Sequence, residues 1–371
     1  MTPISKAYKN ILGESDFVYL DIGARSGPSK KIKELFDDNI IKLILVEFER
    51  EEIKRLKEQG YIVCEKPLWS ELTQKDVYQT KNKSRSSLLK PNQEVIDGSF
   101  YADRNFYEVE KIIQKKTTTL KELLSENQNK FKQIDFIKID VQGAEGYIFQ
   151  SFDSEIWNNL IGCKTETFTN KLYEDTQCLD ILIPQFYNNG FEIYDLKKGH
   201  SMMRTSFMNE KIYSEDYFQA RPNSRFYKGK DLVYDILFLK SIDNIINNKN
   251  TKQVRKIIFI LMLYGYYDFA FFTLLKSKKI KILTEEDFKK LVSTVSKNLP
   301  KYYGELTPEL INSAAKRNQF VEDVVAERIL AEAKWNLAYE DSGIEYTKLS
   351  EVGNDIVGKD GKAERPELVK G

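Results

Sequence analysis

The sequence predicts a doubly wound α/β sheet followed by an all-helical C-terminal region. Apolar, strand-like runs alternate with helical segments from residue 17 to residue 240. The early runs are apolar throughout, which is typical of strands covered on both faces. Beyond residue 240 the pattern is helical and contains no strand candidate. Alternation of this kind indicates parallel strands joined by helices.

The first strand, helix and strand form a βαβ unit with an acid at the end of each strand. Residues 17–22 run into Asp21 and a turn with Gly23 and Gly27, and residues 42–47 end in Glu47. Such a unit binds a nucleoside-containing cofactor at the carboxyl edge of the sheet. The turn lacks the Gly-x-Gly-x-x-Gly pattern that holds a pyrophosphate. A carboxylate here instead suits the ammonium and sulfonium of S-adenosylmethionine.

The other elements follow the same alternation. Further strands are expected at 61–65, 134–140, 161–168, 191–195 and 232–239, and helices near 29–38, 49–59, 119–131 and 175–189. Two polar segments, 70–118 and 196–230, interrupt the rhythm, and long polar insertions are usually functional loops or disordered segments. Residues 107–119 alternate well enough to predict an extra strand.

Composition excludes several functional classes. The 371 residues include 57 Lys and Arg against 56 Asp and Glu, a net charge of +1. Such a balance does not predict nucleic acid or an anionic membrane as a partner. Cys64, Cys163 and Cys178 have no metal or redox spacing. The first residues have no hydrophobic signal region, so a cytoplasmic location is expected.

The C-terminal third predicts an accessory region. We expect a domain at 1–240, a helical region at 241–340 and a mobile tail at 341–371. Residues 257–275 are apolar and aromatic, with Gly265 and Asp268 inside them. A buried helical hairpin turning near Gly265 is the favoured interpretation, since Asp is costly within a bilayer. Membrane association through this hairpin and a protein partner bound by the helices stay open.

A third acidic strand end contains the strongest motif. The segment Ile134-Asp-Phe-Ile-Lys-Ile-Asp-Val-Gln-Gly-Ala-Glu-Gly146 brings Lys138 and Asp140 to the sheet edge, and Glu145 begins the next helix. Together with the Asp21–Gly27 turn, Val46-Glu47 and Thr119–Leu124, this segment resembles the FkbM-type S-adenosylmethionine-dependent methyltransferases. The resemblance covers roughly residues 15–240. The chain departs from it by having Arg25 in place of Asn, Phe48 in place of Pro and Gln142 in place of Glu.

The resemblance implies a class I methyltransferase sheet, Rossmann-like, whose last strand (232–239) is antiparallel. It also implies roles for the strand ends. The methionine end of the cofactor would be held by Asp21, Gly23, Ala24 and Gly27. Glu47 would accept hydrogen bonds from the ribose hydroxyls. The adenine would lie against Leu68, Trp69 and Ser70, and Asp140 would face the reacting methyl group.

Three residues are candidates for the general base: Asp140, Glu166 and His200. Methyl transfer to a hydroxyl needs alignment, exclusion of water and removal of one proton. Asp140 and Glu166 could instead share a divalent ion, although two ligands are too few to predict a metal site. Some of these residues could have structural roles instead. Asp21 could be the N-cap of a helix, and Lys138 could form an ion pair with Asp140 or a neighbouring acid without taking part in the reaction.

The leading hypothesis is an S-adenosylmethionine-dependent O-methyltransferase. By analogy with the family, its acceptor would be a hydroxyl of a sugar, a glycan or a related metabolite. One alternative is a catalytically inactive scaffold that uses its C-terminal helices. Another is a Rossmann-like enzyme with NAD, against which the glycine pattern argues.

Overall fold

The computed structural model describes residues 3–98, 104–198, 202–203 and 230–297. The chain divides into two compact units, Met1–Leu291 and Val292–Gly371. The second unit has only its first residues, the end of one helix, among those described. The predicted domain boundaries at 240 and 340, and the predicted tail, therefore stay predictions.

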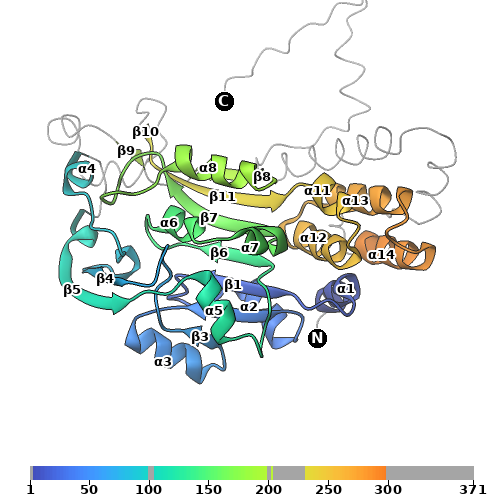
Figure 1. Ribbon diagram of the computed structural model, residues 1–371, viewed down its shortest axis with the longest axis horizontal. Coiled ribbons are helices and arrows are strands. Elements are labelled where there is room, and N and C mark those ends of the chain that lie inside the picture. Colours follow the sequence, from blue (N-terminus) through green and yellow to red (C-terminus); the bar gives the residue numbers. More distant parts are fainter. Residues whose placement is uncertain (1–2, 99–103, 199–201, 204–229, 298–371) are drawn as a thin grey trace, which may run out of the picture. The chain divides into compact units, whose positions relative to one another are not determined.

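A seven-stranded sheet forms the centre of the first unit (Figure 1), in the order β3-β2-β1-β6-β7-β11-β8. The strands are β1 (Val18–Ile22), β2 (Lys42–Val46), β3 (Ile62–Cys64), β6 (Phe136–Ile139), β7 (Gly162–Phe168), β8 (Phe191–Lys198) and β11 (Val233–Lys240). Neighbours from β3 to β7 are parallel, and β11 runs antiparallel to both β7 and β8. The α/β class, all seven predicted strands and the antiparallel last strand are confirmed.

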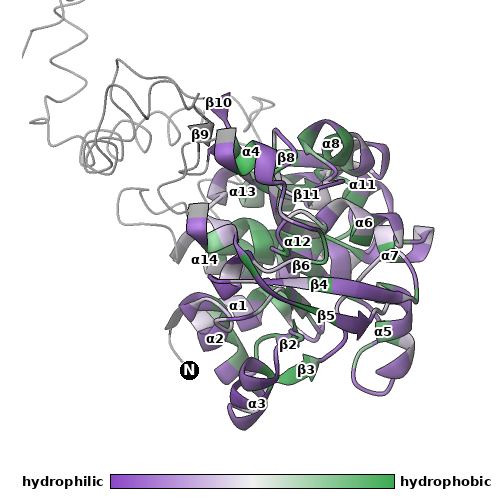
Figure 2. Cartoon of the chain, turned by 90° about the vertical axis from the view of Figure 1, so that its left-hand side faces the viewer, coloured by the Kyte–Doolittle hydropathy of each residue, from purple (hydrophilic) through white to green (hydrophobic). Residues whose placement is uncertain are grey.

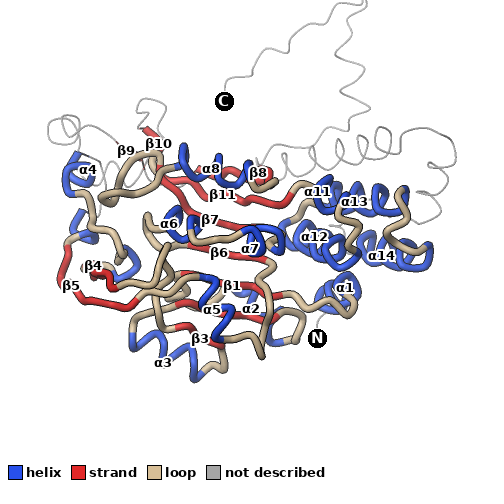
Figure 3. Tube along the Cα trace, in the orientation of Figure 1, coloured by secondary structure: helices blue, strands red, loops and turns tan. Residues whose placement is uncertain are grey.

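Helices connect the strands and extend the chain beyond them (Figure 3). The helices before β11 are α1 (Pro3–Leu12), α2 (Lys30–Asp37), α3 (Arg50–Glu58), α4 (Gln93–Gly98), α5 (Leu120–Glu126), α6 (Glu145–Gln150), α7 (Ser154–Asn159) and α8 (Leu179–Asn188). Those after it are α11 (Ile242–Asn247), α12 (Thr251–Tyr264), α13 (Tyr267–Lys279) and α14 (Glu285–Lys297). The four predicted helices correspond to α2, α3, α5 and α8.

Alternate residues of each strand face two different layers of helices, as the period of a strand requires. On one face Leu20 and Ile137 belong to a hydrophobic cluster that also contains buried residues of α5, α6, α7 and α8. On the other face the Tyr19 ring stacks on Phe136, with 5.2 Å between ring centroids, and Phe136 stacks on Tyr264 of α12 at 5.5 Å. Helix α12 therefore covers the second face of the sheet.

A buried ion pair attaches α12 to the amino ends of the strands. Lys256 Nζ lies 2.6 Å from Asp135 Oδ1, and the two side chains are 7% and 0% exposed. Asp135 also accepts hydrogen bonds from the Val18 backbone N–H and the Gln133 side chain. A charge buried in this way needs its partner, so α12 is part of the folded sheet domain.

The apolar run at 257–275 forms the predicted helical hairpin. Helix α12 ends at Gly265, whose φ of +88° suits glycine, and α13 begins two residues later. Nine residues of α12 are buried, and Figure 2 shows this helix as predominantly hydrophobic. Within the described part of the chain, no helix is long and apolar enough to span a bilayer.

The polar insertion contains an antiparallel ribbon of β4 (Gln74–Thr80) and β5 (Val109–Lys116). Between its strands lie η1 (Lys83–Arg85), α4 and η2 (Arg104–Tyr107). The predicted extra strand at 107–119 is confirmed as β5. Figure 1 places the ribbon at one end of the sheet and the helices α12 and α13 at the other. A second small pair joins β9 (Met202–Met203) to β10 (Lys230–Asp231).

Candidate active site

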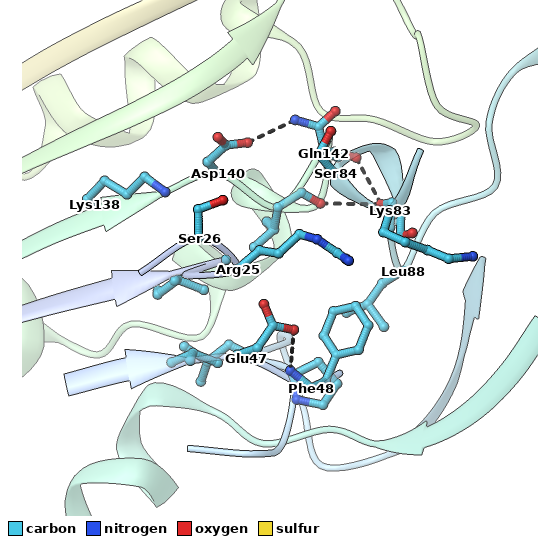
Figure 4. Close-up of a pocket in the computed structure, with 18 of the residues that line it drawn as sticks. Arg25, Ser26, Glu47, Phe48, Lys83, Ser84, Leu88, Lys138, Asp140 and Gln142 are labelled. Carbon is cyan, nitrogen blue, oxygen red and sulfur yellow. Dashed lines mark hydrogen bonds between the residues drawn. The ribbon is translucent and has the colours of Figure 1, made fainter. Parts of the chain in front are cut away.

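A cavity of about 280 Å³ opens at the carboxyl ends of β1, β2 and β6 (Figure 4). Its volume is close to the lower end of typical ligand pockets, about 300–1,000 Å³. The turn after β1 contributes Gly23, Arg25, Ser26 and Gly27 to its wall, and the end of β2 with the residues after it contributes Val46, Glu47 and Phe48. The strand β6 and the loop after it contribute Lys138, Asp140, Val141 and Gln142. The far wall is formed by Pro67, Leu68 and residues of the segment 83–88.

The turn after β1 depends on Gly23. Its φ is +80°, and a Cβ atom there would lie 2.0 Å from the Asp140 carbonyl oxygen. The Gly23 and Ala24 backbone N–H groups both donate to the Val46 carbonyl, each at 3.2 Å. Only glycine fits this conformation and this approach, so Gly23 brings the ends of three strands together below the cavity.

The Glu47 carboxylate, directly after β2, is a hydrogen-bond acceptor held in place by the backbone. Its Oε1 accepts hydrogen bonds from the backbone N–H groups of Phe48 at 2.7 Å and Glu49 at 2.9 Å. These bonds fix the carboxylate and leave Oε2 available to a ligand. Burial raises the pKa of Glu47, and the two backbone bonds oppose that rise. Nearby, Arg25 forms an ion pair with Glu49.

Asp21 lies below the cavity rather than in its wall. Its side chain is 7% exposed, and its Oδ1 is 3.1 Å from Lys138 Nζ. Burial lowers the pKa of Lys138, but the charges of Asp21, Asp140 and Glu166 more than offset this, so its pKa is raised. Lys138 itself lines the cavity. Asp21 is not among the lining residues, and its predicted contact with the methionine end of a cofactor stays a prediction.

Asp140, Gln142 and Glu166 form a connected polar group. The Gln142 amide nitrogen donates to Asp140 Oδ1 at 2.9 Å and to Glu166 Oε2 at 3.0 Å. Burial raises the pKa of Glu166 to about 8, and the charge of Asp140 adds to that rise. Asp140 and Gln142 line the cavity, whereas Glu166 does not line it and is bonded to the Gln142 amide. Of the two acids, Asp140 is the one placed to meet a substrate.

The loop between β6 and α6 is held by Glu145, the first residue of α6. Its two carboxylate oxygens accept from the backbone N–H groups of Val141 and Gly143, both at 2.9 Å. Complete burial raises the pKa of Glu145 to about 7, with the backbone bonds opposing the rise. Its bonds fix the loop that carries Gln142, and it does not line the cavity.

Part of the polar insertion at 70–118 forms the cavity's outer wall. We call residues 82–88 the serine loop, and Lys83, Ser84, Ser86, Ser87 and Leu88 of this loop line the cavity. The Ser87 hydroxyl donates to the Gln142 carbonyl at 2.8 Å, and the Ser87 backbone pairs with Tyr78 of β4. The polar string Ser84-Arg-Ser-Ser87 can be seen in the sequence. Its position at the cavity follows from its pairing with β4.

The predicted site residues are partly brought together. Among them Gly23, Gly27, Glu47 and Asp140 line the cavity. Ala24 is buried beside Gly23, while Trp69 and Ser70 follow the lining residue Leu68 without lining the cavity. The Trp69 ring stacks on Tyr147 at 4.4 Å, with Lys75 over the ring. His200 lies outside the described residues. The roles of all these residues remain predictions.

Metal ligands do not gather within the described ranges. No group of three or more His, Cys, Asp or Glu side chains there could hold a metal ion. An acid at the end of β2, a glycine turn after β1 and a mixed polar and apolar wall match a nucleoside with a charged tail.

Comparison with known proteins gives one family. Residues 21–193 match the model of the family described as the methyltransferase FkbM domain, which confirms the resemblance over this range. No curated protein matches the chain. Among solved structures, precorrin-6y C5,15-methyltransferase from Geobacter metallireducens is 12% identical, covering 64% of this chain and 87% of its own, with a TM-score of 0.25. StiE O-MT is 9% identical, covering 63% and 73%, with a TM-score of 0.28.

Proposed function

We propose that the protein is an S-adenosylmethionine-dependent O-methyltransferase, because residues 21–193 match the model of the FkbM methyltransferase domain. Its acceptor is a hydroxyl group of a sugar, a glycan or a related small metabolite. The observation that supports this proposal best is the cavity between the Gly23 turn and Glu47, with Asp140 in its wall.

The residues present fit the proposed cofactor. The Glu47 carboxylate, already fixed by two backbone bonds, would bind the ribose hydroxyls through its remaining oxygen. The turn from Gly23 to Gly27 would hold the methionine end, and Phe48 and Leu68 would contact the adenine. When bound, the cofactor supplies an activated methyl group. No pyrophosphate-binding glycine pattern is present at this turn, which favours this cofactor over NAD.

The chain's own contribution is binding, orientation and removal of a proton. Asp140 would accept the proton of the attacking hydroxyl, because it is the acid that lines the cavity. Lys138 and Asp21 hold the β1 and β6 ends as an ion pair below it. The serine loop would lie over the acceptor, and its hydroxyls and Leu88 would exclude water and bind the acceptor's polar and apolar faces.

Calorimetric titration with S-adenosylmethionine, S-adenosylhomocysteine and NAD tests the cofactor. We expect both adenosyl ligands to bind and NAD not to bind. Glu47→Ala should weaken binding about 10–100-fold, the equivalent of losing about 1.5–3 kcal/mol of charged hydrogen bonding. Glu58→Ala, an exposed acid at the end of α3, is the matched control and should bind as wild type does.

Two results would contradict the proposed function. Binding of NAD alone would contradict the methyltransferase assignment. Binding of none of the three ligands by folded protein would favour a scaffold function instead. If binding holds, methyl transfer from labelled cofactor to a panel of hydroxylated acceptors then tests the acceptor class.

A further inference from the structure

A basic segment without acids passes through the outer wall of the cavity. Residues 77–93 include four Lys or Arg residues and no Asp or Glu, although the two kinds of charge are balanced over the whole chain. A run of cations is often only a solvated surface. Part of this run differs, because the serine loop lies within it and Lys83, Ser84 and Ser86 line the cavity. The chain therefore places positive charge beside the proposed acceptor.

Cations outnumber acids among the described residues that line the cavity. These charged residues are Arg25, Lys83, Lys138, Glu47 and Asp140. The acid partners of the three cations lie outside the lining, and in the same order they are Glu49, Glu110 and Asp21. The proposed function uses both lining acids, one for the ribose and one for the attacking hydroxyl. The cations are left to meet a negative charge on a ligand.

Lys83 is the lining cation that belongs to the serine loop. Figure 4 shows it across the cavity from Asp140, with its ammonium farthest from the strand ends, while Arg25 extends from the β1 turn toward the same loop. The Lys83 ammonium is 2.6 Å from Glu110 Oε2 of β5, and the two side chains are 31% and 46% exposed. Ion pairs this exposed contribute little to stability. Lys83 can therefore exchange Glu110 for an anion of a ligand at small cost.

The Ser86 hydroxyl adds a neutral donor beside this cation. The Thr80 backbone N–H donates to Ser86 Oγ at 3.2 Å, which leaves the proton of that hydroxyl for a ligand. The neighbouring serines use theirs within the chain, because Ser84 Oγ donates to Asn82 and Ser87 Oγ donates to the Gln142 carbonyl. An ammonium with a hydroxyl donor suits the oxygens of a phosphate or a carboxylate.

We propose that the acceptor carries an anionic group, a phosphate or a carboxylate, which Lys83 and Ser86 of the serine loop bind while its hydroxyl faces Asp140. The acceptor class is then a sugar phosphate or a sugar acid rather than a neutral sugar. A positive wall also raises the local concentration of such anions. That the bound anion is an acceptor rests on the proposed function, whereas the anion site itself does not.

Binding of three small probes to the full chain saturated with S-adenosylhomocysteine tests the site. Glucose 6-phosphate carries a phosphate, glucuronate a carboxylate, and methyl glucoside no charge. Ligand-detected NMR at low ionic strength, where exposed charges are least screened, measures their affinities. We expect at least one anionic probe to bind about tenfold more tightly than methyl glucoside. The tighter of the two anions identifies the group that the site prefers.

Lys83→Met and Lys90→Met form a matched pair of variants. Lys90 lies in the same basic segment and has a similar exposed ion pair, 2.7 Å from Glu174, but it does not line the cavity. Lys83→Met should weaken binding of the anionic probe about tenfold and leave methyl glucoside unchanged. Lys83→Arg should retain most of the affinity, because it keeps the charge. Lys90→Met should bind all three probes as the wild type does.

Three results would overturn the inference. These are equal affinity of the wild type for the anionic and neutral probes, an unchanged affinity in Lys83→Met, and an equal loss in Lys83→Met and Lys90→Met, which would indicate general surface charge. If the folded wild type does not bind S-adenosylhomocysteine, the same titrations are made without it. Anion binding that depends on Lys83 would then support the site and contradict the methyltransferase proposal. Ligand binding without such anion binding would support the methyltransferase proposal alone.

Discussion

Gly23→Ala should damage the site far more than the same substitution at another glycine of like conformation. A Cβ at Gly23 would lie 2.0 Å from the Asp140 carbonyl oxygen and 3.0 Å from its carbonyl carbon. Both are backbone atoms, so the ends of β1 and β6 would have to separate by more than about 1 Å to restore ordinary contact. Gly60 also has a positive φ, +85°, but a Cβ there would meet nothing within 4 Å.

The magnitudes follow from this difference. A left-handed conformation costs a non-glycine residue about 1–2 kcal/mol, which both variants suffer. The Gly23 variant adds an overpacking cost of about 1–3 kcal/mol. We therefore expect Gly23→Ala to lower the free energy of unfolding by about 2–5 kcal/mol and Gly60→Ala by about 1–2 kcal/mol.

Urea unfolding and calorimetric binding of S-adenosylhomocysteine measure the two effects. Because the displaced strand ends form the cavity floor, folded Gly23→Ala should bind at least about tenfold more weakly, or about 1.4 kcal/mol. Gly60→Ala should retain wild-type affinity. Equal stability of the two variants, or wild-type affinity in Gly23→Ala, would refute the reasoning that this glycine holds the strand ends together.

The remaining predictions concern buried charges. Lys256→Met should lower the free energy of unfolding, measured in urea, by about 3–5 kcal/mol, because it leaves Asp135 charged and buried. The double variant that adds Asp135→Asn should recover part of this loss. A loss under about 1 kcal/mol in Lys256→Met would show that the ion pair is dispensable. The pKa of Glu145 is about 7 in the folded protein, against an ordinary 4.5. Between these pH values the folded state therefore binds more protons than the unfolded state. Glu145 should then lower the free energy of unfolding as pH rises from about 4.5 to about 7, by about 3 kcal/mol in all. Glu145→Gln should flatten that part of the stability profile, and an unchanged slope would contradict the assignment.

The sheet was predictable because its strands are apolar on both faces and end in recognisable residues. The runs ending at Asp21, Glu47 and Asp140 gave three neighbouring strand ends, and parallel strands place such ends at one edge. The buried hairpin at Gly265 was predictable from an apolar run interrupted by glycine. Each of these patterns lies within a short stretch of sequence, and such patterns predict individual helices and strands well.

The parts that were not predictable depend on distant contacts. The Lys256–Asp135 pair joins residues far apart in sequence, so no spacing indicates it. The serine loop matches no sequence motif, and it reaches the cavity through the pairing of Ser87 with Tyr78 and the bond from the Ser87 hydroxyl to the Gln142 carbonyl. Gln142 could be taken for a tolerated substitution, since its two acids and Tyr173 meet only in the folded chain.

A crystal structure of the protein with S-adenosylhomocysteine tests the central claim most directly. The account predicts the ligand in the cavity between the Gly23 turn and Glu47, with the ribose hydroxyls on the Glu47 carboxylate and the homocysteine sulfur on the Asp140 side. A ligand bound elsewhere, or bound here without contact to Glu47, would contradict the account.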